Sequence, residues 1–329
     1  MRCAYLCYQQ GPHRAHKRQA KALNPEIVPM RLNVFPTGFK TYDLLISEGF
    51  RPSIMGFLMK RMHMTEWHIN LLLGDFMSSI IKKSCLKRLV DLIYRDCDGI
   101  IANSSLTADI YQKHFGKKYT HKLKVCWPIA NIKPFRERAV KNVDRASAIC
   151  YLGHLTHLDG ADLLSEIFYR IQNELNADNI DMYIIGTGIV YEKLLQIAEK
   201  EENFHVLGYQ PRNIIKEVFK KCLIFVYPAR LKFFGLPVIE AMAAGLIPIV
   251  TEMTGARDLV KRVNSKLVTP VDVNIISEKI VEILRMGPKE KIELSQKAKY
   301  VAIEHVETAK ITFESFLRNF LHQSQNSIK

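Results

Sequence analysis

Residues 222–251 read CLIFVYPARLKFFGLPVIEAMAAGLIPIVT and decide the fold class. The run 222–227 is continuously apolar, which is typical of a strand buried on both faces of a parallel sheet. Gly235 and Pro237 then predict the start of a short helix, because glycine allows a tight turn and proline has no amide to lose in a first helical turn. The run 247–251 is apolar again. Strand, helix and strand in this order predict a parallel sheet covered by helices.

The same alternation extends over the rest of the chain and occurs twice. It predicts an α/β protein with two doubly wound, Rossmann-like sheets facing a cleft. We expect strands at 2–7, 27–32, 42–47, 68–73, 99–103 and 123–127, and then at 147–152, 182–185, 204–207, 222–227, 247–251 and 266–268. We expect helices near 13–23, 52–62, 77–95, 105–114, 160–174, 190–200, 212–220, 237–244, 255–262, 273–286, 288–304 and 306–322.

A linker between the two sheets is predicted at 134–147, because this segment is charged, contains Pro134 and lacks a strand pattern. The predicted domains are therefore 1–144 and 145–329. Little strand signal follows residue 268, so the closing helices must pack on these domains. The sequence leaves open whether the last helix crosses back to the first domain.

The composition is that of a globular protein, with 48% hydrophobic and 24% charged residues among 329. This length suits two domains that each bury a core. No apolar run reaches the roughly 18 residues of a membrane-spanning helix, and the start of the chain turns polar and basic after a short apolar run. We therefore expect a soluble, cytoplasmic protein whose seven scattered cysteines are reduced and buried.

The net charge of +14 is concentrated in the first half of the chain. Residues 1–144 hold 24 Lys and Arg against 11 Asp and Glu, whereas residues 145–329 hold 23 against 22. A one-sided basic surface favours an anionic partner, such as phospholipid headgroups, a lipid phosphate or nucleic acid. The alternative is a solvated basic face without a partner.

One predicted helix in the basic half is amphipathic. Its basic residues are Lys82, Lys83, Lys87 and Arg88, and its apolar residues are Ile80, Ile81, Leu86, Leu89 and Val90. Such a helix lies on a membrane surface in some proteins. In others the apolar stripe simply packs on the core and the basic face is wet.

The helix start near Gly235 is a predicted anion site, because free amides and the positive end of the helix dipole meet there at the end of a strand. From Phe234 to Ala241 the chain resembles the signature of the retaining, nucleotide-sugar-dependent glycosyltransferases of the GT-B fold. That signature reads Glu, Gly, Phe, Gly, Leu, Pro, two variable residues, Glu and Ala. The resemblance continues in family order at 151–153, 184–188, 206–209 and 255–260, and more weakly at 43–46 and 100–104.

Four positions depart from the family pattern. Lys232 occupies the position of the first Glu, and Phe233 follows it where Gly is usual. His154 and Asp159 stand where the family has an Arg and a Lys that neutralise the donor diphosphate. Because the signs at 159 and 232 are exchanged, we expect both side chains to border one site, with Lys232 supplying the cation and Asp159 pairing with it or with a sugar hydroxyl. The alternative is that both positions drifted after catalysis was lost.

The resemblance implies roles for residues of the second domain. Glu240 would bind the donor ribose, the amides of the helix start would hold phosphate, and Lys232 would assist as a second catalytic residue. Glu240 as an ordinary first-turn acid is the competing explanation. The implied donor-binding residues are His154, Asp159, Gly160, Gly186, Gly188, Gly208, Tyr209, Phe234, Gly235, Leu236, Pro237 and Val238.

In the first domain, the resemblance implies an acceptor-binding role. Gly11 follows the first strand where relatives have a glycine-rich loop, and Arg14 and Lys17 come soon after it. Cations in the first turns of a helix oppose its dipole, so a bound phosphate or lipid anion would relieve that cost. For Arg14 and Lys17 a solvated face is an equal alternative. Asp75 follows the fourth strand and is an acceptor-side candidate, with a role in turn formation as its alternative.

The resemblance implies an enzyme of the hexosyltransferase type that transfers a sugar from a nucleoside diphosphate sugar to an acceptor hydroxyl with retention of configuration. Synthesis of a polysaccharide, glycolipid or glycoconjugate is the expected setting, with a lipid-linked acceptor and a peripheral position on the inner membrane face left open. A catalytically silent sugar-binding or scaffold domain is the alternative. We expect no metal or cofactor, since the 11 histidines form no HExxH motif or Cys/His ladder. Nucleic acid ranks last, because reader motifs are lacking.

Overall fold

The computed structural model describes residues 2–8, 12, 17–20, 25–30, 40–72, 84–136, 148–176 and 180–326. The chain forms two compact units: unit 1 is Met1–Ile129 with Glu307–Lys329, and unit 2 is Ala130–Val306. Unit 2 thus begins before the division predicted at residue 144. The reason is that the segment after Ala130 already packs on unit 2, where the Phe135 ring lies 5.5 Å from that of Phe219. Most of the predicted linker, residues 137–147, lies outside the described residues.

The sheet of unit 2 is parallel and doubly wound. Its six strands pair in the order β12-β11-β10-β7-β8-β9, so the direction of winding reverses between β7 and β10. Ligands of open parallel sheets bind beyond the carboxyl ends of the strands near such a reversal. The strands are β7 Ala148–Leu152, β8 Met182–Ile185, β9 Phe204–Gly208, β10 Cys222–Tyr227, β11 Ile247–Thr251 and β12 Val268–Thr269.

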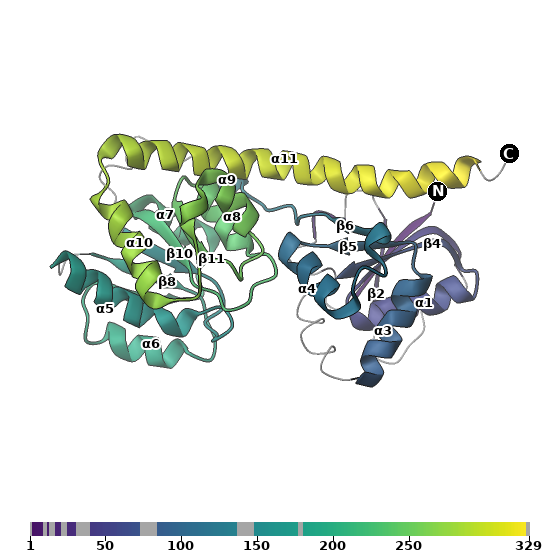
Figure 1. The fold of residues 1–329 in the computed structure, drawn as a ribbon, viewed down its shortest axis with the longest axis horizontal. Helices are drawn as coiled ribbons and strands as arrows, with labels where there is room; N and C mark the ends of the chain where they lie inside the picture. Colours follow the sequence, from purple (N-terminus) through teal and green to yellow (C-terminus); the bar gives the residue numbers. More distant parts are fainter. Residues whose placement is uncertain are drawn as a thin grey trace. The chain divides into compact units, whose positions relative to one another are not determined.

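Helices cover both faces of this sheet. Figure 1 shows α5, α6 and α10 on one face and α7, α8 and α9 on the other, as right-handed crossovers require. Each face thereby buries apolar strand residues. The helices are α5 Leu164–Leu175, α6 Tyr191–Ala198, α7 Arg212–Lys221, α8 Leu236–Ala243, α9 Arg257–Val263 and α10 Val273–Arg285. Short 3-10 turns lie at Ala161–Leu163 and Ser265–Leu267.

Unit 1 is built on a second parallel sheet. Its order is β2-β1-β3-β4-β5-β6, which again reverses direction, here between β1 and β3. The strands are β1 Cys3–Tyr8, β2 Glu26–Met30, β3 Tyr42–Glu48, β4 Thr65–Leu72, β5 Gly99–Ala102 and β6 Leu123–Val125. The helices are α1 Phe50–Arg61, α3 Ser84–Asp96 and α4 Ser105–Phe115, with 3-10 turns at Thr120–Lys122 and, in unit 2, Lys133–Phe135.

The last helix, α11, is Pro288–Asn326 and belongs to both units. Its first part packs in unit 2, where the Ser295 hydroxyl donates a hydrogen bond to the Gly245 carbonyl. Its later part completes the core of unit 1, where Phe313 and Leu317 are buried against the sheet. The two closing helices predicted at 288–304 and 306–322 are therefore wrong as separate elements. No glycine or proline interrupts the sequence between them, so the helix continues.

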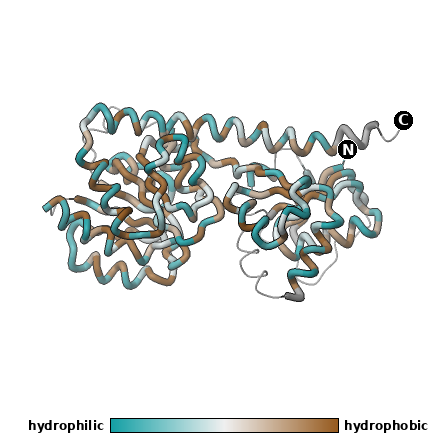
Figure 2. The backbone as a smooth tube through the Cα atoms, viewed as in Figure 1, coloured by the Kyte–Doolittle hydropathy of each residue, from teal (hydrophilic) through white to brown (hydrophobic). Residues whose placement is uncertain are grey.

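The cores follow the apolar runs of the strands. Figure 2 shows hydrophobic colouring along the inner strands of each unit and hydrophilic colouring on outward helix turns. Six cysteines whose side chains the structure describes are free and buried, as the sequence predicts: Cys3, Cys7, Cys97, Cys126, Cys150 and Cys222. Among the described helices, none combines the length and the apolar character that a bilayer crossing requires.

The predicted fold class is confirmed as two doubly wound parallel sheets with interleaved helices. One predicted helix is wrong over the residues that can be checked, because 17–20 of the expected helix 13–23 form a turn. The Gln19 side chain explains this local structure, since its amide donates hydrogen bonds to the carbonyls of Cys126 and Trp127. A tertiary anchor of this kind has no signature in local sequence periodicity.

Candidate active site

The candidate site lies at the carboxyl end of β10. The 228–235 loop follows this strand and leads to Gly235, whose left-handed backbone, with φ of 96°, turns the chain into α8. Pro237 occupies the first helical turn, as predicted. The amide end of α8 therefore points to the edge where ligands of parallel sheets bind, and its dipole favours an anion there.

The 228–235 loop is held rigidly against the loop that precedes α9. The Lys232 amide donates to the Met253 carbonyl at 2.8 Å, and the Gly255 amide donates to the Lys232 carbonyl at 2.7 Å. A third bond joins the Ala256 amide to the Phe234 carbonyl at 2.7 Å. Behind the loop, the Phe234 ring lies 5.9 Å from the ring of His305 in α11. The amide end of α8 is thus preorganised by backbone bonds and by packing.

Asp159 and Lys232 form an ion pair at this edge. The Lys232 Nζ lies 2.6 Å from the Asp159 Oδ1, and the Asp159 side chain is only 8% exposed. The Tyr227 hydroxyl donates to the same oxygen at 2.8 Å, and the Thr156 hydroxyl donates to Oδ2 at 2.7 Å. The contact expected from the exchanged signs of the two residues is present.

Three donors around one carboxylate compensate for its burial. Burial, together with the nearby Tyr151 and Asp159, raises the pKa of the Tyr227 phenol well above its usual value. The phenol therefore stays protonated and continues to donate to Asp159. Stacking of Tyr227 on Tyr151, with ring centroids 5.4 Å apart, fixes the position of that hydroxyl.

A second ion pair joins the same two loops. The Arg230 guanidinium makes two hydrogen bonds to the Asp162 carboxylate, at 2.8 and 3.0 Å. Burial alone would raise the pKa of Asp162, but the hydrogen bonds from Arg230 and His157 and the charge of Arg230 hold that pKa below its usual value. The amides of Arg230 and Leu231 also donate to the Leu158 carbonyl. The loop after β7 and the loop after β10 therefore form one rigid surface.

Glu240 is buried on α8 and meets a cation that the sequence did not single out. Its Oε1 lies 3.0 Å from Nη2 of Arg212, at the first position of α7. Arg212 also donates to the Asn131 carbonyl and lies over the ring of Phe135, 5.9 Å from its centroid. The sequence did contain an indication of this role, because Arg212 is a cation in the first turn of a predicted helix. A cation there opposes the helix dipole and is stabilised by an acidic partner.

Glycines at this edge allow loops to approach each other closely. Gly160 has φ of 72°, and a Cβ there would lie 1.9 Å from the Pro228 carbonyl oxygen. Gly186 has φ of 142°, and a Cβ there would lie 1.8 Å from the Gly153 carbonyl oxygen. Gly188 approaches the Leu155 carbonyl in the same way. The predicted glycines therefore shape one compact carboxyl edge formed by β7, β8 and β10.

Exposed apolar side chains stand on three loops of this edge. Leu158, Ile189 and Tyr209 are 60%, 77% and 79% exposed and follow β7, β8 and β9, respectively. An exposed aromatic ring beside a glycine turn, here Gly208, offers a face on which a planar ring can stack. His154 is exposed on the first of these loops, and its carbonyl accepts a hydrogen bond from the Tyr151 hydroxyl.

The acceptor-side candidates are covered in part. Lys17 is exposed in the turn 17–20 of unit 1. Gly11, Arg14 and Asp75 lie outside the described residues.

Among the predicted donor-binding residues of α8, Leu236 and Pro237 are half-buried and Val238 is buried. No group of three or more potential metal ligands occurs in the described part of the chain.

A family model matches residues 133–302, which include the Asp159–Lys232 and Glu240–Arg212 pairs and the start of α8. Its description is "Glycosyl transferases group 1". The match covers more than half of the 329 residues.

Two relatives illustrate the sequence similarity. The uncharacterized glycosyltransferase MJ1607 of Methanocaldococcus jannaschii is 27% identical over 144 residues, which are 43% of this chain and 36% of that protein. Mannosylfructose-phosphate synthase of Agrobacterium fabrum is 23% identical over 176 residues, which are 49% of this chain and 39% of that protein. The chain thus spans less than two fifths of the length of these relatives.

A solved structure shows the same fold over nearly the whole chain. Anabaena Alr3699/HepE in complex with UDP and glucose has a TM-score of 0.75 and 16% sequence identity. The superposition covers 97% of this chain and 99% of that one. The architecture is therefore that of the GT-B glycosyltransferases.

Proposed function

The chain belongs to the glycosyl transferases group 1 family, and on that premise we propose that it transfers a sugar from a nucleoside diphosphate sugar to an acceptor hydroxyl with retention of configuration. The observation that carries this proposal is the amide end of α8, held beside the Asp159–Lys232 pair at the carboxyl edge of β10. In this proposal, that edge binds the donor diphosphate.

The electrostatics of the edge suit such a reaction. The departing nucleoside diphosphate gains negative charge in the transition state while the sugar becomes cationic. Amides and the dipole at the α8 start stabilise the developing anion without reorganisation. The Lys232 side chain is 28% exposed, and its ammonium has hydrogens beyond the one directed at Asp159, so this group can add to that stabilisation. The proposal therefore assigns charge neutralisation to protein groups, with no metal or cofactor.

Specific side chains take the remaining roles. Glu240 accepts hydrogen bonds from the ribose hydroxyls, and Arg212 orients its carboxylate. The exposed ring of Tyr209 stacks on the base. Asp159 holds Lys232 in place and can also accept from a sugar hydroxyl. In this proposal, different residues thus contact separate parts of one donor.

We assign acceptor binding to unit 1, where the excess positive charge of the chain lies. An acceptor in polysaccharide, glycolipid or glycoconjugate synthesis, with a lipid phosphate, would match this charge. The enzyme would then work in the cytoplasm at the inner face of a membrane. HepE was solved with UDP and glucose, which supports a nucleotide sugar as the donor class.

Calorimetric titration with UDP, GDP, ADP and their sugars tests the donor site. We expect one nucleotide series to bind, and Glu240→Ala to weaken that binding at least about tenfold, because a charged acceptor is lost. Glu192→Ala is the matched control, since Glu192 is an exposed acid in the first turn of α6. Absence of nucleotide binding contradicts the proposal, and the anomeric configuration of the product by NMR tests retention.

A further inference from the structure

One face of α11 presents a regular stripe of charged and large apolar side chains. Its positions follow one another at alternating steps of four and three residues, which keeps them on one side of an α-helix and is the spacing of a seam between two helices. All of these side chains are exposed or half-buried, so the stripe lies on the side of α11 away from the core. We call this set the α11 stripe, and its members are Glu293, Lys297, Tyr300, Glu304, Glu307, Ile311, Glu314 and Arg318.

Two large apolar side chains of the stripe are open to solvent. Tyr300 is 65% exposed and Ile311 is 66% exposed. Their separation along the sequence corresponds to about three helical turns, so both point to the same side of α11. A single exposed apolar side chain needs no explanation. Two of them, spaced by whole turns on one helix face, can both pack against a second helix.

The charged residues toward the ends of the stripe are poorly compensated within the chain. Glu293, Lys297 and Arg318 have no ion-pair partner among the described residues. Glu314 reaches only Lys310 of the same helix, at 3.8 Å. These four charges are therefore available to a partner of complementary charge.

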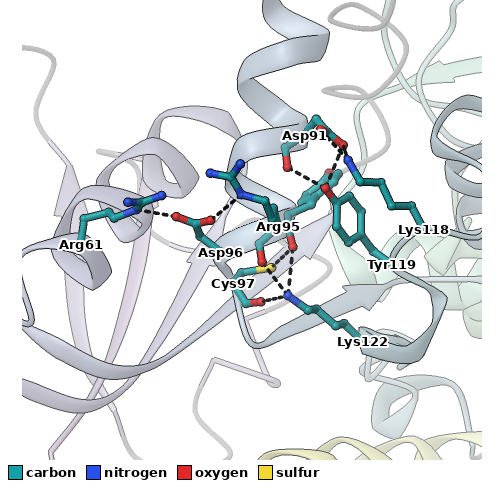
Figure 3. A network of polar contacts seen from close by, with 9 residues as sticks. Arg61, Asp91, Arg95, Asp96, Cys97, Lys118, Tyr119 and Lys122 are labelled. Atoms are coloured by element: carbon teal, nitrogen blue, oxygen red, sulfur yellow. Dashed lines mark hydrogen bonds and ion pairs between the residues drawn. The ribbon is translucent and has the colours of Figure 1, made fainter.

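Charged side chains on the surface of unit 1 are paired more closely. Figure 3 shows the Asp91 carboxylate beside the ammonium of Lys118, at 2.9 Å. It also shows Asp96 between Arg61 and Arg95, at 2.5 and 3.0 Å. Pairs of this kind leave little charge for another molecule to neutralise, so the α11 stripe differs from them.

We propose that the α11 stripe is the interface of a homodimer, in which α11 of a second copy packs antiparallel on it. Tyr300 lies against Ile311 of the second copy, and the twofold axis passes between His305 and Val306, midway between those two positions. Each contact occurs twice in such an interface, because the same surface is used by both copies. The inference concerns assembly and does not depend on sugar transfer.

The charges of the stripe are complementary in this register. Lys297 faces Glu314 of the second copy, and Glu293 faces Arg318 of the second copy, because both pairs have the same midpoint in the sequence as the apolar pair. Opposite charges therefore meet on both sides of the twofold axis, outside the apolar contacts. One register thus satisfies the apolar and the outer charged positions together, and this agreement favours a second copy of the chain as the partner.

The centre of the interface contains acids and a cation from a neighbouring helix. Glu304 faces Glu307 of the second copy there, and two carboxylates alone would repel each other. Arg262 of α9 is bound to Glu304, and its side chain is 39% exposed. The guanidinium therefore offsets part of the negative charge at the axis.

Other arrangements and partners fit the stripe less well. In a parallel pair in register, each charge meets its own counterpart, such as Lys297 against Lys297, and like charges across an interface are unfavourable. A nucleic acid or an anionic bilayer would meet four glutamates and only two cations in the stripe.

Sedimentation equilibrium of the full chain, without nucleotide or acceptor, tests the dimer. We expect reversible dimerisation with a dissociation constant of about 1–100 µM, because a single pair of helices buries a small interface. Added salt should weaken it, since exposed charges contribute. A chain that remains monomeric at about 200 µM overturns the proposal.

Charge exchange tests the antiparallel register. Lys297→Glu replaces attraction by repulsion at two equivalent places and should weaken dimerisation about tenfold, at about threefold for each place. Addition of Glu314→Lys restores opposite charges and should return the affinity to within about threefold of the unchanged chain. Lys193→Glu on α6 is the matched control and should change nothing, because Lys193 is exposed outside the stripe. A double exchange that fails to recover dimerisation overturns the register.

Removal of the apolar contact tests the other part of the interface. Tyr300→Ser and Ile311→Ser should each weaken dimerisation at least about tenfold, because each change removes apolar contact at two places. Ile275→Ser is the matched control, since Ile275 is 40% exposed on α10. Circular dichroism checks that the variants are folded. Equal weakening by Ile275→Ser and Tyr300→Ser overturns the assignment of the interface to α11.

Disulfide cross-linking gives a second readout of the register. A mixture of Tyr300→Cys chains and Ile311→Cys chains should form a covalent dimer under mild oxidation faster than either variant alone, because the two positions face each other across the axis. The unchanged chain measures the background from its native cysteines. Fastest cross-linking of the Tyr300→Cys chain with itself would indicate a parallel pair and contradicts the antiparallel dimer.

Discussion

Two clusters of buried polar groups, one in each unit, are satisfied in opposite ways. In unit 2, buried carboxylates at the carboxyl edge face cations, as Asp159 faces Lys232 and Glu240 faces Arg212. In unit 1, a neutral network is buried between β3, β4 and α1. Its members are Ser47, Ser53, His68 and Asn70, joined by hydrogen bonds such as the 2.6 Å contact from the Asn70 amide to the Ser53 hydroxyl.

This difference suggests different roles for the two clusters. The neutral hydrogen bonds in unit 1 fix the positions of core side chains but create little electrostatic potential that a charged ligand could use. Buried ion pairs pay a desolvation penalty, so well-packed apolar residues would often be at least as stable in their place. Their presence at the edge of unit 2 makes sense where an anion must later be stabilised. The comparison predicts that substitutions that change charge lower the stability of unit 2 more than that of unit 1. A fall in pH should lower the stability of unit 1 more.

The largest effect is expected from the pair at the edge of unit 2. Asp159→Lys puts two ammonium groups side by side in a position where the Asp159 side chain is 8% exposed. We expect the free energy of unfolding of unit 2 to fall by about 3–5 kcal/mol. Urea unfolding followed by hydrogen exchange of unit 2 peptides measures this loss.

The reciprocal exchange, Asp159→Lys with Lys232→Glu, is the control for that loss. It restores opposite charges in contact and should recover most of the stability and of the nucleotide affinity. Losses that simply add in the double variant would show that the two side chains do not act as a pair.

A glycine series is expected to give the next largest effect. Gly160→Ala needs a Cβ at 1.9 Å from the Pro228 carbonyl oxygen, so unit 2 should lose about 3 kcal/mol or more. Gly116→Ala in unit 1 is the control, because Gly116 also has a positive φ, of 63° with a ψ of −155°, but no atom lies within 4 Å of its Cβ position. Backbone strain alone should cost about 1–3 kcal/mol there, and Gly160→Ala should lose more because it adds a steric clash. Equal losses in thermal melts would contradict close loop packing as the role of Gly160.

The elements of the fold could be predicted where apolar runs end at turn residues. The strands Met182–Ile185, Cys222–Tyr227 and Ile247–Thr251 have their predicted bounds for this reason. The continuity of α11 was not predicted, because a helix that packs on two cores has two apolar faces in succession, and this pattern looks like two helices. Hydrophobic periodicity shows which face of a helix is apolar, but it does not show whether the helix continues from one face to the next.

The site could be predicted only in part. The contact of Asp159 with Lys232 was expected because the exchanged signs of two positions implied it. The pairs of Glu240 with Arg212 and of Asp162 with Arg230 join segments 28 and 68 residues apart, and only the folded sheet brings them together. The amphipathic helix α3 was ambiguous from its stripe alone, because a core and a bilayer select the same pattern.

A pH effect is expected in unit 1. Burial, and then the charge of Lys60, lowers the pKa of His68 from 6.5 to about 3. Below pH 6.5 the unfolded chain therefore binds a proton that the folded chain does not, and stability falls by about 1.4 kcal/mol per pH unit toward pH 3. At pH 5 the loss is about 2 kcal/mol.

Intrinsic fluorescence measures this loss, since both tryptophans, Trp67 and Trp127, belong to unit 1. His68→Gln removes the titrating ring and should flatten the dependence of the unfolding midpoint on pH between 6.5 and 5. Unit 2 peptides in hydrogen exchange serve as the internal reference, because the substitution should leave their pH dependence unchanged. A steep profile that persists in the variant would assign the acid sensitivity to other groups.

The smallest effect concerns the cation beside Glu240. Arg212→Met leaves a buried carboxylate with one partner fewer, and we expect nucleotide affinity to fall about tenfold, with a stability loss of about 1–2 kcal/mol. Arg212→Lys keeps the charge and should recover part of the affinity. Arg170→Met removes an exposed pair with Glu166 on α5 and should change neither quantity measurably, since such pairs contribute little. If calorimetry finds the same affinity for Arg212→Met as for the unchanged chain, the buried pair serves folding alone, and the contrast between the units loses its link to binding.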